Sequence, residues 1–398
     1  MNLRTEEAFW LMKNGLTNVY KTLESNMKTD VVVIGAGITG ALASYYLSKA
    51  GIEVIVLDKR HPGMGSTAAS TALLQYEIDE PMHSLKKIVG NKRASQSYLA
   101  CINALGKLKQ LVRDEKLYVD FEMVPSLQYA SYKKDVALLK EEFKARKKLG
   151  IEVELLEPVE IKKRFFLDSP GALWSAKGGK VDPYALTQGL LKACQPNLKV
   201  FDGIEVKQIE TNKNYLKVKT SDGKNIKAKY AIVACGYEAK KFLPFSVVKI
   251  GTTYAFVTKP LDEARLWENE TLLWETKTPY LYIRTTPHHR LLAGGRDDSY
   301  HNVGKRNKLL PIKINALVND VQKLLNMEIK SDFAWAGAFG STKDSLGYVG
   351  SIKQLPRVFF ILGYGGNGIL YSQIGAEIVR DSILARKNAL ENLFEFER

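Results

Sequence analysis

The stretch that decides the fold runs from Asp30 to Asp58 and reads DVVVIGAGITGALASYYLSKAGIEVIVLD. Its continuous β-branched run, Val31–Ile34, is typical of a strand buried on both faces of a parallel sheet. The pattern G-x-G-x-x-G follows, and then a segment of helical composition that ends at Gly51. A second apolar run, residues 52–57, leads directly to Asp58. The stretch therefore predicts a complete β-α-β unit.

The three glycines of this unit have separate physical tasks. Gly35 permits the tight turn after the strand, Gly37 lets the backbone approach a pyrophosphate, and Gly40 allows close packing of helix and sheet. The helix N-terminus offers unpaired N–H groups and a partial positive charge to the phosphates. Asp58 can accept hydrogen bonds from ribose hydroxyls. These features predict a dinucleotide-binding site.

Two further segments favour FAD over a nicotinamide nucleotide. Residues 65–72, GSTAASTA, are small and hydroxylic, so their backbone can lie against a flat ring and a phosphate chain. Near the other end of the chain, residues 363–368, GYGGNG, precede a second predicted helix. Its N-terminus, at Gly365 to Gly368, suits the anionic edge of a reduced flavin. An extended FAD between the two glycine-rich helix starts explains both.

The chain resembles the D-amino-acid oxidase superfamily of FAD enzymes, and its pattern is close to glycine and sarcosine oxidases. The resemblance covers residues 29–398 and is specific in the order of its motifs. Besides the β-α-β unit and residues 65–74, the matching segments are Val181-Asp182-Pro183, Tyr230 to Gly236, Trp335-Ala336-Gly337, Thr342-Lys343-Asp344, Gly363 to Leu370, Leu393-Phe394 and Arg398.

The resemblance implies a fold of the α/β plus α+β class. A Rossmann-like FAD-binding domain with a parallel sheet is interleaved with a substrate domain on a mostly antiparallel sheet. We expect a helical lead-in at 1–28, the FAD-binding domain at 29–90, 150–235 and 330–398, and the substrate domain at 91–149 and 236–329. The residues expected to bind FAD, beyond Gly35, Gly37, Gly40 and Asp58, are Ile38, Thr39, Lys59, Gly65, Ser66, Thr67, Thr71, Ala72, Leu73, Val206, Ala234, Gly236, Tyr364, Gly365, Gly366, Asn367, Gly368, Ile369 and Leu370.

The carboxylate clamp common in this family is an arginine, and here the chain departs from the pattern. Phe339 and Gly366 occupy the two places where the related enzymes carry arginine. The pocket tyrosine is matched by Tyr282, and Arg284 shares its strand face, because side chains two apart point the same way. We therefore predict that Tyr282 and Arg284 hold the substrate. Arg296 is a second candidate for the clamp.

The resemblance also bears on how the flavin is held and reoxidised. Gly337 stands about where sarcosine-oxidase-like enzymes carry the cysteine that links to flavin, so we predict noncovalent FAD. The comparable strand, Leu291 to Ala293, lacks the lysine that activates oxygen in those enzymes. The electron acceptor is therefore left open between oxygen and a quinone or other carrier.

Composition narrows the remaining classes. The 398 residues include 58 Lys and Arg and 43 Asp and Glu, which gives a net charge of +15. The basic residues are dispersed along the chain, and no zinc-ligand spacing or aromatic RNA-binding motif accompanies them. This pattern argues against a nucleic-acid partner. No apolar run is long enough for a membrane span, although peripheral contact of the basic surface with a membrane stays open. Three widely separated cysteines indicate a reducing compartment, hence the cytoplasm.

The predicted function is that of an FAD-dependent oxidoreductase acting on a small-molecule substrate. The expected reaction is dehydrogenation of a small amine or amino acid by hydride transfer to flavin N5. Oxidation of a 2-hydroxy acid or of a polyol phosphate is an alternative. A non-catalytic FAD subunit of a larger complex is another.

Overall fold

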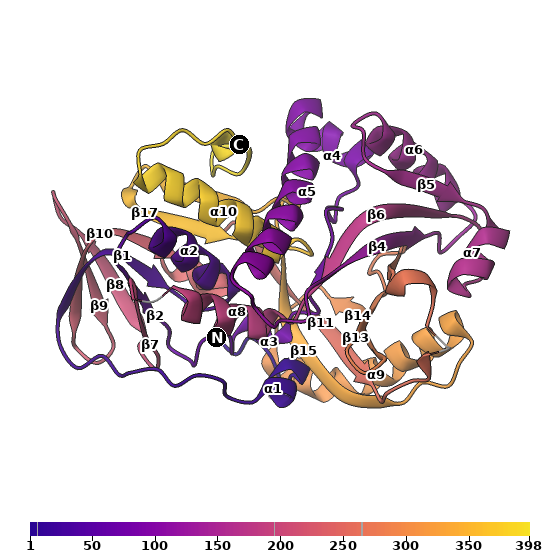
Figure 1. Ribbon diagram of the computed structural model, residues 1–398, viewed down its shortest axis with the longest axis horizontal. Helices are drawn as coiled ribbons and strands as arrows, with labels where there is room; N and C mark the ends of the chain where they lie inside the picture. The colour runs from indigo at the N-terminus through magenta and orange to yellow at the C-terminus, as the bar shows by residue number, and fades with distance from the viewer. Residues whose placement is uncertain (6, 195, 264–265) are drawn as a thin grey trace.

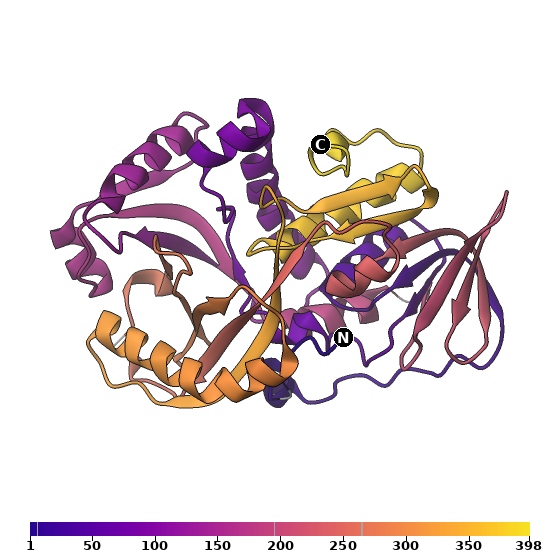
Figure 2. The same cartoon turned by 180° about the vertical axis from the view of Figure 1, so that it is seen from behind.

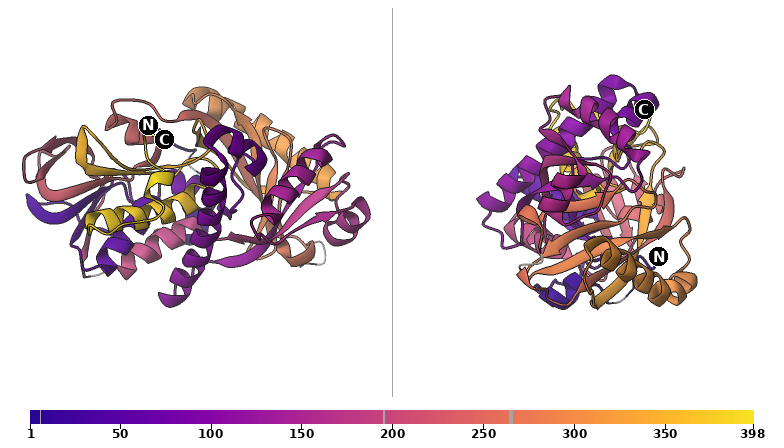
Figure 3. Two further views of the ribbon diagram at one scale, coloured as in Figure 1. Left: turned by 90° about the horizontal axis from the view of Figure 1, so that it is seen from above. Right: turned by 90° about the vertical axis from the view of Figure 1, so that its right-hand side faces the viewer.

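The computed structural model describes residues 1–5, 7–194, 196–263 and 266–398. Two large β-sheets lie side by side, one in each half of the view in Figure 1, and Figure 2 shows the same arrangement from behind. The helix α5 (Asn91–Asp114) stands between the two halves, as the view from above in Figure 3 shows. This layout confirms the predicted combination of a parallel, Rossmann-like sheet with a mostly antiparallel one.

The first sheet contains the predicted β-α-β unit. Its order is β16-β17-β10-β1-β2-β7, with β9 and β8 added beside β10. The strands are β1 (Met27–Ile34), β2 (Val54–Leu57), β7 (Leu198–Phe201), β8 (Val206–Thr211), β9 (Leu216–Thr220), β10 (Asn225–Val233), β16 (Tyr348–Ile352) and β17 (Leu355–Leu362). β7, β2, β1, β10 and β17 run parallel. Val31 and Val33 face a core shared with α2 (Ile38–Lys49), α8 (Pro183–Ala193) and α10 (Gly368–Ile383).

The second sheet has the order β15-β11-β14-β13-β12-β4-β6-β3, with β5 beside β6. Its strands are β3 (Leu73–Leu74), β4 (Glu122–Tyr129), β5 (Val153–Leu156), β6 (Ala172–Lys180), β11 (Lys249–Thr258), β12 (Leu272–Glu275), β13 (Tyr282–Thr286), β14 (Arg290–Asp298) and β15 (Ser331–Ser341). All its pairs are antiparallel except β12 with β4. Helix α9 (Val303–Leu325) packs on β11, β14 and β15.

The other helices within the described ranges are short or lie at the periphery. They are α1 (Phe9–Asn14), α3 (Ser66–Ala69), α4 (Met82–Val89), α6 (Asp135–Lys147), α7 (Pro158–Phe165), η1 (Gly236–Lys241), η3 (Glu268–Glu270) and η4 (Glu391–Leu393). Among the described residues of the N-terminal segment, α1 is the only helix. The first residues are extended, and Leu3 O accepts a hydrogen bond of 2.7 Å from Ala338 N in β15. The prediction of a helical lead-in is therefore wrong for most of 1–28.

The strand pairing corrects the predicted domain boundaries. β5 and β6 fall in 150–235 and β15 falls in 330–398, yet all three pair in the second sheet. Conversely, α5 falls in the predicted substrate domain but packs against α10 in the core of the first sheet. The chain crosses between the sheets more often than its local patterns reveal, because a strand's sequence does not specify which sheet it joins.

Candidate functional site

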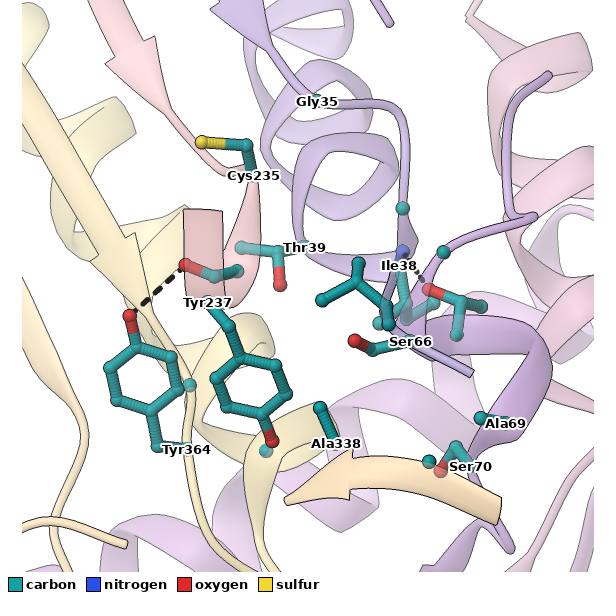
Figure 4. A pocket seen from close by; sticks show the side chains of 18 of the residues that line it. Gly35, Ile38, Thr39, Ser66, Ala69, Ser70, Cys235, Tyr237, Ala338 and Tyr364 are labelled. Atoms are coloured by element: carbon teal, nitrogen blue, oxygen red, sulfur yellow. Dashed lines mark hydrogen bonds between the residues drawn. The ribbon is translucent and has the colours of Figure 1, made fainter. Parts of the chain in front are cut away.

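A cavity of about 590 Å³ is lined by residues of both sheets. Figure 4 shows Gly35, Ser66, Cys235 and Tyr364 around it. The predicted cofactor-binding residues that line it are Gly35, Gly37, Ile38, Thr39, Asp58, Lys59, Gly65, Ser66, Thr67, Thr71, Ala72, Leu73, Val206, Ala234, Gly236, Tyr364, Gly365, Gly366, Gly368 and Ile369. The structure thus brings together segments that are more than 300 residues apart in the sequence.

The glycine turn between β1 and α2 has no room for side chains. Gly35 has a left-handed φ of 103°, and a Cβ there would lie 2.7 Å from Ala234 O. A Cβ on Gly40 would lie 1.8 Å from Gly35 O, so this glycine closes the turn from behind and does not itself line the cavity. The turn therefore carries no side chains at Gly35 and Gly37, where a pyrophosphate would approach the backbone, as the sequence predicts.

Asp58 directly follows β2 and lines the cavity. Its Oδ2 accepts a hydrogen bond of 2.6 Å from Ala36 N, and its Oδ1 accepts one of 2.8 Å from Arg60 N. Burial raises the pKa of this carboxyl. Nearby, Glu238 binds Lys59 at 2.5 Å and the N-terminal amine of Met1 at 2.8 Å. These charges surround the end of the cavity that is expected to hold the ribose.

The Ser/Thr loop is anchored from several sides. Thr67 Oγ1 accepts a hydrogen bond of 3.0 Å from Ile38 N, which joins the loop to the start of α2 (Figure 4). Trp335 Nε1 donates to Ala69 O at 2.9 Å, and Trp10 Nε1 donates to Ser70 O at 2.7 Å. The loop backbone is therefore a rigid wall of the cavity.

The late glycine loop forms the opposite wall and leads into α10. Gly366 N donates to Asp79 Oδ2 at 2.9 Å, and a Cβ on Gly366 would lie 2.6 Å from Asp79 Oδ1. Asn367 points away from the cavity, and its Nδ2 donates to Gln75 O at 2.6 Å and to Glu77 O at 2.8 Å. Leu370 is buried in the core of the first sheet. Neither Asn367 nor Leu370 lines the cavity, so the structure does not support their predicted contact with the cofactor.

The two predicted clamp arginines are not in the cavity. Arg284 is fully buried, and its Nη1 donates to Ala72 O at 2.7 Å and Val181 O at 3.0 Å. Its guanidinium also lies 5.3 Å from the centre of the Trp10 ring. Burial lowers the pKa of Arg284 to about 10. The structure therefore corrects its predicted role, because these bonds support the Ser/Thr loop from behind.

The prediction that Arg296 could be the carboxylate clamp is also wrong. It forms an ion pair of 2.6 Å with Asp320 of α9, and 41% of its side chain is exposed. Its neighbour Asp297 lines the cavity instead. A left-handed φ of 58° at Arg296 marks the bend in the backbone at this point of β14. The alternation of side chains along an ideal strand does not predict this reversal.

Tyr282 lines the cavity as predicted, together with Tyr280, Thr253 and Asp297. The hydroxyls of Tyr282 and Thr253 are 3.4 Å apart. Burial raises the pKa of Asp297 to about 6, and its Oδ1 is buried with no hydrogen-bond partner among the described residues. We call these four residues the substrate end of the cavity, because they lie beyond the glycine loops.

Sequence reasoning missed several functional candidates. The sequence prediction does not include Asp297, which lies directly after Arg296. Asp79 closes the sequence QYEID, residues 75–79, directly after the Ser/Thr loop, and this acidic alternation was an available signal. Tyr237 stacks on Tyr364 with ring centres 5.3 Å apart, and both rings border the cavity in Figure 4. Nothing in the sequence around Tyr237 indicated that pairing.

The bare glycine turn, Asp58, the rigid loop and the late glycine loop together fit FAD. Cys235 also lines the cavity, but burial raises the pKa of its thiol to about 12, so it is a protonated and weakly reactive group. In the described ranges, no three His, Cys, Asp or Glu residues are placed to bind a metal ion. No helix in the same part of the chain is long and apolar enough to cross a membrane.

Comparisons with known proteins identify the family of the chain. The model of the DAO family, described as FAD dependent oxidoreductase, matches residues 30–382. Gamma-glutamylputrescine oxidoreductase of Escherichia coli is 26% identical over 91% of this chain and 85% of its own length. Glycine oxidase of Bacillus subtilis is 24% identical over 90% of this chain and 94% of its own length.

Solved structures show the same fold. The crystal structure of glycine oxidase from Geobacillus kaustophilus superposes with a TM-score of 0.78, at 17% identity, over 94% of this chain and 99% of that one. The family model covers most of the chain and gives FAD as the cofactor, as predicted, while its noncovalent attachment stays a prediction. The chain therefore belongs to the DAO family of FAD-dependent oxidoreductases.

Proposed function

We propose that the protein dehydrogenates a small amine or amino acid at the carbon next to nitrogen. The observation that carries the proposal is one continuous cavity, in which two glycine-rich helix starts lead to the substrate end formed by Tyr282, Tyr280, Thr253 and Asp297. The relatives named gamma-glutamylputrescine oxidoreductase, glycine oxidase and monomeric sarcosine oxidase support oxidation of a C–N bond. When bound, FAD supplies a hydride acceptor at flavin N5.

The residues of the substrate end would act mainly by holding the substrate amine in position. Burial raises the pKa of Tyr282 well above its ordinary value, so its hydroxyl stays protonated and can donate a hydrogen bond. Thr253, at 3.4 Å from that hydroxyl, restricts where it points. An amine held by these groups needs no strong general base once its nitrogen lone pair is free, because orientation supplies much of the rate enhancement.

The test is an anaerobic titration of the purified holoenzyme with amines, amino acids, 2-hydroxy acids and glycerol 3-phosphate. The absorbance of oxidised flavin near 450 nm should fall with at least one amine. Deuterium on the carbon next to nitrogen should slow that decay, because this C–H bond is the one broken. If only hydroxy acids or glycerol 3-phosphate bleach the flavin, the proposal is wrong.

The alternative of polyol-phosphate oxidation lacks its main requirement. The basic residues that line the cavity in the described part of the chain are Lys59, Arg60, Lys240 and Lys241, which follow β2 or belong to η1. None of them belongs to the strands that form the substrate end. A phosphate there would face Asp297 without a cationic partner.

The electron acceptor and the location of the enzyme stay predictions. We propose oxygen, a quinone or another carrier as the acceptor, and the cytoplasm as the compartment. Following substrate-dependent oxygen consumption beside reduction of a soluble quinone, with the same enzyme sample, separates an oxidase from a dehydrogenase.

A further inference from the structure

The substrate end of the cavity is built around acidic side chains. Asp297 lines it directly, and Asp79 lies behind Tyr280, whose hydroxyl donates to Asp79 Oδ1 at 3.0 Å. The lysines and the arginine that line the cavity among the described residues are at the ribose end. A substrate carboxylate at the substrate end would therefore meet like charge, whereas an ammonium group would meet opposite charge.

One carboxylate oxygen of Asp297 is available to accept a hydrogen bond from a ligand. The Oδ1 atom is shielded from solvent yet has no partner in the described structure. The next residue, Asp298, is satisfied: it binds Lys313 Nζ at 2.6 Å and accepts from Tyr254 Oη at 2.8 Å. Leaving one buried carboxylate oxygen unbonded is costly, and an N–H donor from a ligand would remove that cost.

A second, smaller cavity of about 20 Å³ adjoins the first and shares Gln75, Tyr280 and Gly366 with it. Glu77 and Asp79 line it, and Trp274 forms an aromatic wall. Glu77 is only 6% exposed; its Oε1 faces Arg146 at 3.4 Å, while its Oε2 is buried without a partner. A space of this size holds one water molecule or one ammonium group.

We propose that the substrate is an aliphatic diamine without a carboxylate, bound with one nitrogen at Asp297 and the other at Glu77 and Asp79 in the smaller cavity. The methylene chain between the nitrogens would lie along Tyr280, and the aromatic rings of Tyr280 and Trp274 would favour the cationic end. The nitrogen at Asp297 lies beside Tyr282 and would first pass one proton to the Asp297 carboxylate, which frees its lone pair. The neighbouring carbon is then the one that gives up hydride and is oxidised. This inference rests on the proposed function and specifies its substrate class.

The test compares three ligands of equal chain length: 1,4-diaminobutane, 1-aminobutane and 4-aminobutanoate, with glycine as a fourth. Binding is measured by calorimetry on anaerobic, dithionite-reduced holoenzyme, in which no turnover occurs, so affinity is obtained apart from activity. The diamine should bind at least tenfold more tightly than the monoamine, and the two carboxylates more weakly than either. Tighter binding of glycine or 4-aminobutanoate would overturn the proposal.

Variants locate the two nitrogens. Asp297→Asn should weaken both amines at least tenfold, and Glu77→Gln should reduce the diamine to the affinity of the monoamine. Asp298→Asn, which removes the adjacent carboxylate outside the cavity, is the matched control and should leave both affinities unchanged. Because Glu77 faces a buried arginine and its variant can misfold, Asp297→Asn decides: unchanged affinity in that variant overturns the proposal.

The outcomes separate this inference from the proposed function. If no amine bleaches the flavin but the reduced enzyme binds the diamine through Asp297, the proposed reaction is wrong and the site is right. If glycine bleaches the flavin at the same rate in wild type and Asp297→Asn, the reaction stands and the diamine site does not.

Discussion

Replacing Asp297 with asparagine should stabilise the free protein at neutral pH. The pKa of Asp297 is raised from 3.8 to about 6, mainly by burial; Asp79 and Asp298 contribute to this rise, while Thr253 and Lys313 oppose it. The folded state therefore holds this proton more tightly than the unfolded chain does, and stability falls as pH rises from about 4 to 6. At about 1.4 kcal/mol for each pH unit between the two values, the ionised carboxylate costs the fold about 3 kcal/mol above pH 7.

The amide of Asp297→Asn has nearly the same shape and no charge, so the variant recovers up to this amount. With an unfolding entropy of about 2 cal/mol/K per residue, about 3 kcal/mol corresponds to a rise of about 4 °C in the melting temperature. The assay is thermal unfolding of ligand-free holoenzyme at pH 8 and pH 4, followed by circular dichroism. The gain should be full at pH 8 and mostly lost at pH 4, where the folded wild type carries the proton and roughly half of the unfolded chains carry it as well.

Asp298→Asn is the control for this experiment as well. It loses the ion pair with Lys313 and should melt no higher than the wild type at pH 8. If Asp297→Asn melts at or below the wild type at pH 8, or keeps its gain at pH 4, then Asp297 is not a buried, unpaired carboxylate and the reasoning fails. Asp297→Asn should therefore stabilise the protein and weaken amine binding at the same time, because the wild type keeps a buried carboxylate for binding at a cost in stability.

Three further predictions concern the cofactor and its support. Arg284→Met should lower the free energy of unfolding by about 2–5 kcal/mol, because the buried oxygens Ala72 O and Val181 O lose their hydrogen-bond donor. Denaturant unfolding measures this loss. Unchanged stability together with altered substrate affinity would show instead that Arg284 binds the substrate. Gly35→Ala should reduce the FAD content of the purified protein at least tenfold, because its Cβ would meet Ala234 O; full flavin absorbance in that variant would contradict the bare-turn argument. Precipitation of the holoenzyme with acid should leave yellow FAD in the supernatant, whereas a yellow pellet would show a covalent link.

Much of the cofactor site could be predicted because its signals are local. The turn at Gly35, the strand ending at Asp58 and the Ser/Thr loop follow one another within a short segment, so the chemistry of each can be read from its neighbours. Even the late glycine loop is recognisable by itself as a helix start. The structure places all of these on one cavity.

The substrate end could not be predicted in the same way. Arg284 was a reasonable candidate from its position two residues after Tyr282, but its partners Ala72 and Val181 lie 212 and 103 residues away. The backbone bends at Arg296, so the side chain of Asp297 lines the cavity and that of Arg296 does not. Neither the burial of a charge nor the absence of its partner can be read from nearby residues.

The amino-acid sequence alone determined that this chain has a β-α-β unit, an FAD site and membership of one enzyme family, because glycine spacing and strand composition act over a few residues. Only the tertiary structure decided which strands join which sheet, which charges enter the cavity and that its substrate end is acidic. Those properties depend on contacts between segments far apart in the chain, where packing and burial set the outcome rather than local preference.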